Sequence, residues 1–346
     1  MKVQLNCRIE IIKPDGKKFS FRCLNACETK KSIYQIGSTA KIKIPTTARL
    51  VKEGKYIASE QTAKKLERGD RIDVYLGYGD DLRLEHTGYI YRVNYTTPVE
   101  IECEGFEFLL RKDCPTKTWR STTLLEVLQY LVKDTEIILK EQQVLATKTA
   151  KETVKYKNSL PDVKFTNFVI KAGQTRLQVL QKIKDDYRLS INFLGAELWA
   201  GLTYTQNLGE VKYRLGWNTI KDNELKYRNA DDVRLKVKAV WVKPDNTRVE
   251  VEIGDKGGQV RTAFFYDVSS KKDLERIATE ELEKYKYSGY EGKITTFIQP
   301  FAMPGMVAVL EDTRYNERNG NYYIIGTKAK FGQSGARRTV ELGIKV

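Results

Sequence analysis

Histidine is almost absent from this sequence: His86 is the single histidine among 346 residues. A Ser-His-Asp triad would have to use it, yet it stands inside an alternating stretch and no G-x-S-x-G motif is present. We therefore interpret it as an ordinary surface or core residue. The sequence also lacks a run of eighteen apolar residues, which excludes a transmembrane helix. Its polar beginning lacks the apolar core of a signal peptide, so we expect a protein that is made in a cytoplasm and stays there, or leaves without a signal.

Cysteines are few and odd in number, since the whole chain contains five. An odd count without a signal peptide argues against a disulfide framework. Cys23 and Cys27 lie close together, but no second pair of cysteine or histidine residues completes a zinc site. Nucleotide-binding motifs are missing as well: there is no P-loop and no Gly-x-Gly-x-x-Gly turn between a strand and a helix. We therefore expect ordinary, mostly buried thiols, no metal and no cofactor.

What the sequence does have is positive charge, because 60 Lys and Arg against 45 Asp and Glu give a net charge of +15. Such an excess indicates an acidic partner, either a nucleic acid or another acidic surface. The basic residues are spread along the chain without a long basic run, so the charge indicates a general electrostatic attraction and not a defined binding motif. Many of the 20 tyrosines stand beside Lys or Arg on alternating stretches. They suit protein interfaces, and they also suit stacking on single-stranded bases.

Three segments differ in their hydrophobic pattern. Residues 1–112 alternate polar and apolar side chains between short turns, which predicts an antiparallel barrel or sandwich. Residues 113–230 add helical periodicity and predict a mixed α/β segment. Residues 231–346 return to alternation, with one helix at about 270–286. The predicted fold is mainly β, with two similar small antiparallel β-barrels and an α+β insertion between them.

The predicted helices begin at recognisable caps. Thr123 and Glu126 have the spacing of a capping box, and apolar residues at helical period follow them. Thr175 and Gln178 repeat this spacing before a second apolar stripe. Ser270 is expected to cap the third helix. Each helix start is thus predicted from a few neighbouring residues.

The last segment repeats features of the first. In each, a glycine turn leads into a strand, and a second glycine precedes an aromatic strand, a turn and a third strand. The stretch that begins at Gly69-Asp70 corresponds to the one that begins at Gly305, and Gly88 corresponds to Gly320. We interpret these five residues as structural turns of a repeated barrel.

Four short acidic stretches suggest functions that their context does not support. The YGDD stretch at 78–81 resembles the metal-binding turn of polymerases, but two-metal chemistry needs a further carboxylate on a neighbouring strand. We interpret it as a hairpin tip. The RGD stretch at 68–70 is interpreted as a tight turn ahead of a strand. The acidic pairs 185–186 and 231–232 are interpreted as solvated caps, with a glycan hydrolase kept as an alternative.

Two strand motifs carry a family resemblance. The stretch 69–74 (GDRIDV) matches a GD-x-V-x-V strand, and 87–90 (TGYI) matches the TG-x-I strand that follows it. The middle stretch 175–193 and the closing stretch 303–331 continue the same order. In this order the chain resembles the baseplate hub proteins of contractile-tailed, Mu-like phages, the late control protein D family. It also resembles the N-terminal part of type VI secretion spike proteins.

The resemblance implies a structural protein without enzymatic activity. It implies a homotrimer whose six similar barrels form a ring, which joins a sixfold tail tube to a threefold spike and encloses a channel. The implied partners are the tail tube protein, the tape measure protein and a spike protein, with DNA passing through the channel and no membrane insertion. Because the last strand runs to Val346, we expect the spike to be a separate protein. The implied location is the virion tail baseplate, assembled in the cytoplasm of a bacterial host.

A different class of function stays open. OB-like barrels with basic and aromatic side chains would also suit a single-stranded nucleic-acid-binding protein. Steeply salt-dependent binding to an oligonucleotide would distinguish this alternative from a tail hub.

Overall fold

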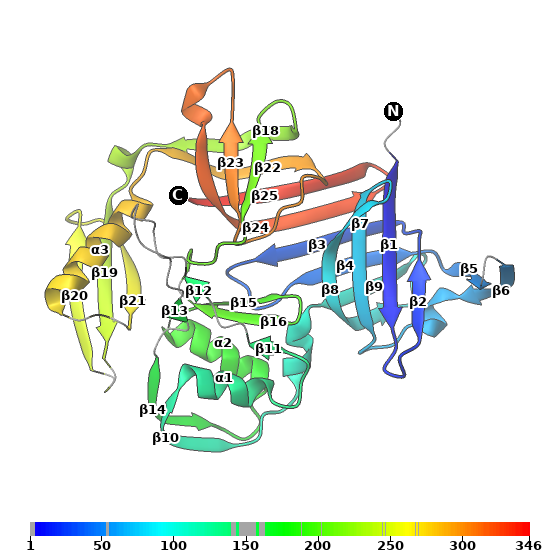
Figure 1. Ribbon diagram of the computed structural model, residues 1–346, viewed down its shortest axis with the longest axis horizontal. Helices are drawn as coiled ribbons and strands as arrows, with labels where there is room; N and C mark the ends of the chain where they lie inside the picture. Colours follow the sequence, from blue (N-terminus) through cyan, green and yellow to red (C-terminus); the bar gives the residue numbers. More distant parts are fainter. Residues whose placement is uncertain are drawn as a thin grey trace.

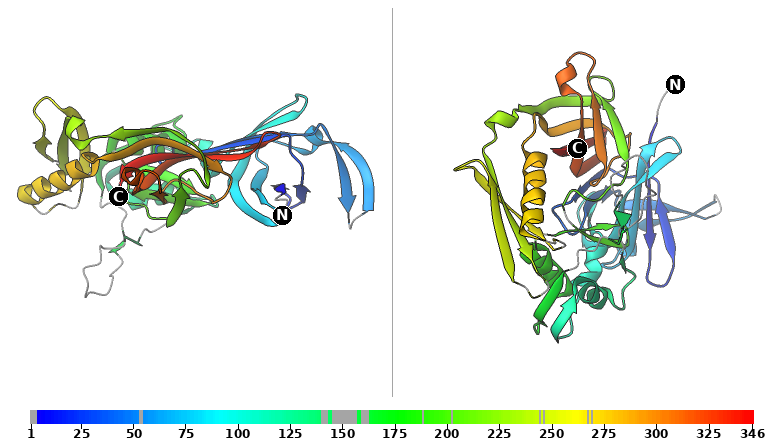
Figure 2. Two further views of the ribbon diagram at one scale, coloured as in Figure 1. Left: turned by 90° about the horizontal axis from the view of Figure 1, so that it is seen from above. Right: turned by 60° about the vertical axis from the view of Figure 1, so that its left-hand side comes forward.

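The protein is built mostly of β-strands, with three α-helices among the residues that the structure describes. The computed structural model describes residues 4–52, 55–139, 143–144, 157–158, 163–187, 189–201, 203–243, 245, 247–266, 268 and 270–346. Figure 2 shows an elongated molecule with helix α3 (Lys271–Tyr285) toward one end and the hairpin of β5 (Thr47–Lys52) and β6 (Lys55–Gln61) at the other. No described helix has both the length and the apolar composition needed to cross a membrane.

One thirteen-stranded sheet forms the body of the molecule (Figure 1). Its first half contains β1 (Leu5–Ile12), β2 (Lys18–Phe21), β3 (Ala26–Ser32), β4 (Thr39–Ile44), β7 (Arg71–Tyr78), β8 (Asp81–Asn94) and β9 (Val99–Glu104). Its second half contains β17 (Glu210–Arg214), β18 (Thr219–Arg228), β22 (Gly289–Phe297), β23 (Val307–Glu311), β24 (Gly320–Gly332) and β25 (Gly335–Lys345). The strand order is β18-β22-β25-β24-β3-β4-β9-β8-β7-β1-β2, with β23 beside β24 and β17 beside β23.

Each half of this sheet packs around a core of its own. Alternate residues of a strand point to the same face, so the alternating pattern of the sequence fills one side of each half with apolar side chains. The first core includes Ile9, Ile42, Ile72, Val74 and Ile101. The second core includes Tyr213, Ile294, Leu310, Ile324 and Val340. Burial of each such large apolar side chain contributes about 1.5–3 kcal/mol, so these cores are the main stabilising term of each half.

The two halves are joined by strand pairing. Ala26–Ser32 of β3 pairs antiparallel with residues 326–332 of β24, and Ile298, Ala329 and Ala336 from the second half complete the first core. The sheet path runs from β18 to β2, so among the described strands neither half closes on itself as a barrel. The halves are therefore open sheets that share one ladder.

The two halves repeat one strand order. The first half contains the order β7-β8-β9-β4-β3 and the second half contains β23-β24-β25-β22-β18, with every pairing along both antiparallel. A short loop joins β3 to β4, whereas the corresponding connection from β18 to β22 holds residues 229–288, which include α3. The predicted mainly β fold with an α/β insertion is confirmed. The two predicted barrels are two similar antiparallel sheets, and among the described strands neither closes into a barrel.

The segment between the halves forms a small α/β layer with helices α1 (Leu124–Val132) and α2 (Arg176–Tyr187). Thr123 and Glu126 form the predicted reciprocal capping box. Thr175 and Gln178 do the same, because each backbone N–H donates to the other's side-chain oxygen. The strands of this layer are β10 (Lys117–Thr123), β11 (Ile138–Leu139), β12 (Gln143–Val144), β13 (Lys157–Asn158), β14 (Lys164–Ile170), β15 (Ser190–Leu194) and β16 (Glu197–Gly201).

A separate three-stranded sheet carries α3 and is called the α3 module here. Its strands are β19 (Leu235–Val242), β20 (Arg248–Gly254) and β21 (Gln259–Phe265), in the order β20-β19-β21. Ser270 caps α3 as predicted, since its hydroxyl accepts the N–H of Asp273. Leu274 and Ala278 of the helix are buried together with Val237 of β19. The module therefore has its own core beside the main sheet.

The predicted segments 1–112, 113–230 and 231–346 stay a prediction as domains. The main sheet takes strands from all three, because β17 and β18 precede residue 231. The strands β19–β21, which follow that position, lie outside the main sheet.

Candidate functional site

The turn ahead of β7 is fixed by hydrogen bonds at both ends. Gly69 N–H donates to Ile90 O and Ile90 N–H donates to Asp70 O, both at 2.9 Å. The buried Asp70 carboxylate accepts the N–H of Glu67 at 2.8 Å and forms an ion pair of 2.8 Å with Lys13. The RGD stretch is thus a tight turn, as predicted, and its aspartate faces the interior.

The second half repeats this turn ahead of β23. Gly305 N–H donates to Ile324 O at 3.0 Å, and Ile324 N–H donates to Met306 O at 2.8 Å. Gly69 and Gly305 have φ angles of +93° and +92°, in the left-handed region that glycine adopts without steric cost. The two glycines therefore occupy equivalent places in the two halves.

The strands that follow these turns keep the same register. Gly88 lies opposite Ile72 in the first half, and the equivalent pair of the second half is Tyr322 opposite Ala308. Gly320, the residue that the sequence comparison matched with Gly88, stands two positions before Tyr322, at the first position of β24. The register of β8 against β9 shifts immediately after Ile90, and the register of β24 against β25 shifts immediately after Ile324. The repeat thus extends from strand order to individual backbone pairs.

Free strand edges of the main sheet are complementary. Beyond Ile324, β24 pairs with β3. In the first half the equivalent edge of β8, beyond Ile90, has no partner among the described strands. The strand β18, which corresponds to β3, also has a free edge, since β22 is its only described partner. Among the described strands, each chain therefore has one free edge equivalent to that of β24, on β8, and one free edge equivalent to that of β3, on β18.

A buried ion pair crosses the junction between the halves. Arg338 of β25 donates from Nη1 and Nη2 to the carboxylate of Glu85 in β8, at 3.1 and 2.5 Å, and both side chains are 2% exposed. Its other N–H groups donate to the backbone carbonyls of Ile298 and Ala302. All five N–H donors of the guanidinium are thus used, which is the condition under which a buried charge is tolerated.

The ion pair between Arg338 and Glu85 was not predicted from the sequence, although the local pattern around each residue indicates an inward position. Arg338 occupies an inward position of the alternating strand β25, where residues two positions away are apolar. Glu85 is the extra residue of a bulge in β8, since the register with β7 shifts between Leu84 and His86. A bulge turns a side chain that alternation would place outside toward the interior. The alternation around Arg338 is visible in the sequence. The bulge at Glu85 can be recognised only once the pairing of β8 with β7 is known.

His86 is a core residue. Burial lowers the pKa of its imidazole to about 3, and the positive charge of Lys31 lowers it further. Its Nδ1 lies 3.5 Å from the hydroxyl of Ser38, and its Nε2 has no partner among the described residues. Burial also lowers the pKa of Lys31, whose ammonium lies 6.0 Å from the ring centroid of Phe301. The imidazole is therefore neutral at pH 7.

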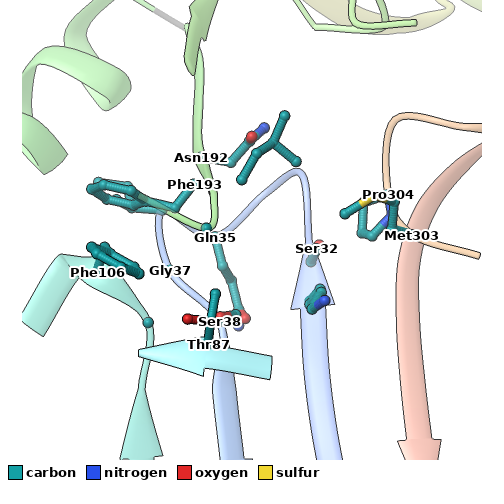
Figure 3. Close-up of a pocket in the computed structure, with 15 residues that line it drawn as sticks. Ser32, Gln35, Gly37, Ser38, Thr87, Phe106, Asn192, Phe193, Met303 and Pro304 are labelled. Atoms are coloured by element: carbon teal, nitrogen blue, oxygen red, sulfur yellow. The ribbon is translucent and has the colours of Figure 1, made fainter. Parts of the chain in front are cut away.

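A small cavity opens where three parts of the chain meet (Figure 3). The first half lines it with the end of β3, the loop that follows β3, Thr87, Gly105 and Phe106. The α/β layer lines it with the end of β15 and its turn, and the second half with Met303 and Pro304 ahead of β23. Its volume of about 50 Å³ accommodates a few water molecules and is too small for a substrate. The cavity marks the meeting point of both halves with the α/β layer.

Glu107 is buried against the loops that line this cavity. Its Oε1 accepts the N–H of Gly105 at 2.9 Å, and its Oε2 has no partner among the described residues. A Cβ at Gly37 would stand 1.9 Å from the carboxyl carbon, so any larger residue at this position would displace the carboxyl group. Burial raises the pKa of Glu107 to about 7. This carboxyl group therefore titrates near neutral pH.

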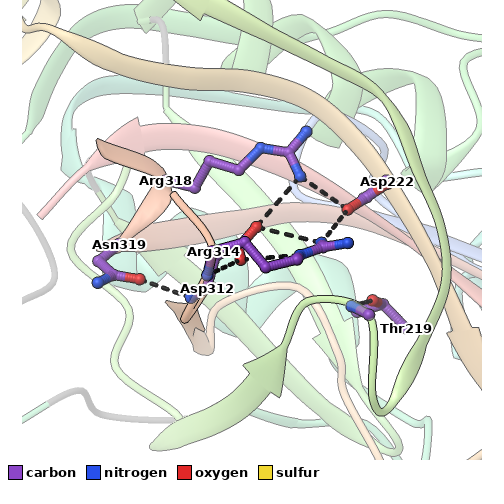
Figure 4. Close-up of polar contacts among 7 residues, drawn as sticks. Thr219, Asp222, Asp312, Arg314, Arg318 and Asn319 are labelled. Carbon is purple, nitrogen blue, oxygen red and sulfur yellow. Dashed lines mark hydrogen bonds and ion pairs between the residues drawn. The ribbon is translucent and has the colours of Figure 1, made fainter. Parts of the chain in front are cut away.

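A charged network fixes the loop between β23 and β24 (Figure 4). Asp312 accepts hydrogen bonds from Arg314 at 3.2 Å and from Arg318 at 3.3 Å, and its N–H donates to Asn319 Oδ1. Arg318 also donates to Asp222 of β18 at 2.8 Å. Burial alone raises the pKa of Asp312, but the hydrogen bonds from the two arginines outweigh it and lower the pKa to about 2. The network ties this loop to β18.

Aromatic side chains are exposed around this network. Trp217 is 73% exposed and Tyr315 is 59% exposed. Arg214 lies 5.6 Å from the ring centroid of Trp217 and pairs with Glu311 at 3.1 Å. Because Trp, Tyr and Arg dominate the binding energy of protein interfaces, this tip of the second half is a candidate contact surface.

The other sequence motifs occupy ordinary structural positions. The stretch 78–81 forms the predicted hairpin tip between β7 and β8. Asp185 is exposed and accepts from Gln181 in α2, and residues 231–232 lie exposed in a short 3-10 turn. All five cysteines are free thiols, and all but Cys23 are buried. Within the described ranges, no group of three or more His, Cys, Asp or Glu is placed to hold a metal ion.

Solved structures with this fold include tail proteins and a component of a secretion system. The tail protein from Neisseria meningitidis MC58 aligns with a TM-score of 0.60 at 12% identity, covering 99% of this chain and 96% of that one. The 43 kDa tail protein of prophage MuSo2 from Shewanella oneidensis aligns with a TM-score of 0.56 at 12% identity, covering 98% and 97%. The E. coli c3393 protein, a component of the type VI secretion system, aligns with a TM-score of 0.51 at 9% identity, covering 99% and 76%.

No protein-family model and no curated protein matches the sequence. The structural likeness extends over nearly the whole chain and confirms the fold that the sequence resemblance implied. At these low identities the likeness concerns the fold.

Proposed function

We propose that the protein is a structural component of a phage or prophage tail baseplate, in which three copies form a hub ring. Two observations support this role: the fold that the chain shares with tail proteins, and its two like halves. Three chains would supply six similar units, and such a ring would join a sixfold tail tube to a threefold spike. In this role the protein works by assembly and not by catalysis.

The observation that carries the proposal is the complementary pair of free strand edges. Inside one chain, β3 joins the first half to β24 of the second half. If the same contact forms between chains, β18 of one copy pairs with β8 of the next copy, beyond Ile90. Such a contact is heterologous, because each copy uses a different edge, and heterologous contacts build rings when the rotation closes.

The repeat also supplies the register of this contact. Within the chain, Lys30 of β3 lies opposite Lys328 of β24. Following the pairings through both halves, Lys226 of β18 takes the place of Lys30, and Asn94 of β8 takes the place of Lys328. We therefore expect Lys226 to lie opposite Asn94 of the neighbouring copy.

Paired cysteines test this register. The variant combines Asn94→Cys and Lys226→Cys in a Cys23→Ser background, which removes the exposed native thiol. Directly opposed residues of an antiparallel pair have Cα atoms about 4.5–5.5 Å apart, within the range that a disulfide bridges. On oxidation we expect a covalent species of three times the 39.8 kDa chain on a non-reducing gel.

A matched pair controls for geometry. Lys30→Cys with Lys328→Cys, in the same background, should crosslink within one chain and leave the mass of a monomer, because these residues are opposed inside the chain. If this control pair oxidises completely while Asn94→Cys/Lys226→Cys stays monomeric at high protein concentration, the proposed ring contact is wrong. An open series of dimers, trimers and longer oligomers would exclude closure at three.

We further propose that the exposed polar face of the main sheet lines the channel, through which the tape measure protein and DNA pass. Lysines and glutamates of neighbouring strands pair there: Lys41 and Lys43 lie 2.8 and 3.5 Å from Glu100, and Lys328 lies 2.7 Å from Glu28. A wall with charges of both signs presents an acidic passenger with no continuous basic strip to which it would adhere. The protein would then be located in the virion tail baseplate.

A further inference from the structure

A groove of about 580 Å³ lies between the α3 module and the α/β layer. One wall is the strand β21, which lies on the side of its sheet that faces the α/β layer in Figure 1. The opposite wall carries polar and aromatic side chains, among them Tyr34, Lys184, Asp185 and Tyr204. The groove is large enough to hold several side chains of a bound peptide.

The strand β21 meets the groove along its edge. Six consecutive residues of the strand, 260–265, line the groove. Because successive side chains point to opposite faces of a strand, a groove touched by every residue lies beside the edge and not on one face. Among the described strands β21 pairs only with β19, so this edge presents unpaired backbone groups to the groove.

The pairing with β19 identifies which backbone groups are free. Gln259 N–H donates to Arg234 O at 3.0 Å, on the β19 side. In a parallel ladder alternate residues make their hydrogen bonds to the same neighbour. The N–H and C=O groups of Val260, Thr262 and Phe264 therefore point away from β19, toward the groove.

This edge lacks the features that usually prevent strand addition. Natural sheet edges are protected by charged side chains, proline, bulges or short length. The other edge of the same sheet, β20, carries Arg248, Glu250 and Glu252. In contrast, β21 has seven residues with the sequence QVRTAFF and one charged residue, Arg261. The exposed edge thus favours pairing with another strand.

Charge complementarity identifies the chemistry of the missing strand. The ammonium of Lys184 is already used, since it donates to the carbonyl of Tyr34 at 2.6 Å. Two carboxylates line the groove, but Glu281 pairs with Lys284 at 3.1 Å and Asp185 accepts from Gln181. Neither of them forms an ion pair with Arg261 among the described residues. Arg261 lies over the ring of Tyr285, 4.5 Å from its centroid. A carboxylate on an incoming strand would find this guanidinium at the wall of the groove.

We propose that the groove binds an extended segment of a partner protein, which adds as a fourth strand beside β21 and places a carboxylate on Arg261. Backbone hydrogen bonds to Val260, Thr262 and Phe264 supply the affinity, and the contact with Arg261 supplies the specificity. This site is separate from the edges of β8 and β18 that would build the ring. It therefore goes beyond the proposed assembly role and does not depend on it.

Selection from a displayed library of random short peptides tests the site on the full chain, and the strongest peptide is then synthesised and measured by fluorescence anisotropy. Thr262→Pro removes one outward N–H without removing a ladder hydrogen bond to β19. Thr262→Val keeps that N–H and is the matched control. Arg261→Glu reverses the charge. Far-UV circular dichroism verifies that each variant is folded.

We expect the selected peptides to combine β-branched residues with Asp or Glu. Their affinity should fall about tenfold or more in Thr262→Pro and in Arg261→Glu, and stay unchanged in Thr262→Val. In the wild-type chain, amide hydrogen exchange at Val260, Thr262 and Phe264 should slow when the peptide binds, a readout that needs no variant.

Three results would overturn the proposal. The library yields no binding peptide, or the selected peptides bind Thr262→Pro as well as wild type. Alternatively, the wild-type chain forms a dimer that Thr262→Pro abolishes, in which case the occupant is a second copy and not a partner protein.

Discussion

Arg338 and Glu85 are separated by 253 positions in the sequence and meet as a buried ion pair between the two halves of the main sheet. The arginine belongs to the second half and the glutamate to the first. A desolvated charge without its counter-charge is costly. Each half therefore contains a group that is stable only when the other half is in place.

Removing the arginine should destabilise the whole sheet. In Arg338→Met the carboxylate of Glu85 and two backbone carbonyls lose their partners, and we expect a loss of about 3–5 kcal/mol in the free energy of unfolding. Urea denaturation followed by circular dichroism measures this loss. Arg337→Met, one residue earlier and partly exposed, should cost less than about 1 kcal/mol. Equal losses in the two variants would show that the ion pair has no special role.

Adding the change Glu85→Gln to Arg338→Met should recover part of the stability, because it removes the uncompensated charge. The double-mutant cycle then gives the coupling between the two residues. A double variant whose loss equals the sum of both single losses would contradict the coupling.

The two repeated glycine turns should respond unequally to alanine. Both Gly69 and Gly305 have positive φ, so alanine costs about 1–2 kcal/mol of backbone strain at either position. A Cβ at Gly69 would meet nothing within 4 Å, whereas a Cβ at Gly305 would stand 2.9 Å from Gln206 Oε1. Gly305→Ala should therefore lower the melting temperature more than Gly69→Ala. Gly69→Asn, which tolerates this conformation, should lower it least.

The buried carboxyl of Glu107 should make the free energy of unfolding fall as pH rises from about 4 to about 7. Its folded-state pKa is raised to about 7, above the unfolded value of about 4.3. The protonated form is therefore favoured by folding, and its contribution is fully present below about pH 4 and lost as pH rises through about 7. Glu107→Gln should remove this dependence and be more stable than wild type at pH 8. Identical pH profiles of melting temperature would contradict the assignment.

The carboxylate of Asp312 should make stability fall in acid, opposite to the effect of Glu107. Its folded-state pKa is lowered to about 2, so its contribution is present above the unfolded pKa of about 3.9 and is lost as pH falls toward 2. Asp312→Asn should destabilise the protein at pH 7, with a smaller difference near pH 2. The comparison uses thermal unfolding at several pH values. A difference that does not shrink in acid would assign the effect to packing.

Local features were predictable from the sequence because their signals lie within a few residues. The caps at Thr123, Thr175 and Ser270, and the hairpin tip at 78–81, depend only on neighbouring positions and were confirmed. The two similar halves were visible as a weak repeat. Nothing in the sequence could show that their sheets share a ladder through β3 and β24, because strand register between distant segments is set by packing.

The interior charges and the groove were not predictable for the same reason. Glu85 faces the core only because of a bulge, whose position depends on pairing with β7. Burial raises the pKa of Glu107, and the carboxyl group is packed against Gly37, seventy positions earlier in the sequence. The residues 260–265 read as an ordinary alternating strand, and only the tertiary arrangement shows that one edge is open.

The strand β24 determines how the molecule comes apart. One of its edges pairs with β25, and its other edge is shared by β23 and then β3. Heating cannot release one half while the other stays intact, because separation breaks a seven-residue ladder and uncovers the neighbouring core at once. The main sheet should therefore melt as one calorimetric unit despite its two cores. The α3 module, which has its own sheet and core, can melt at a different temperature.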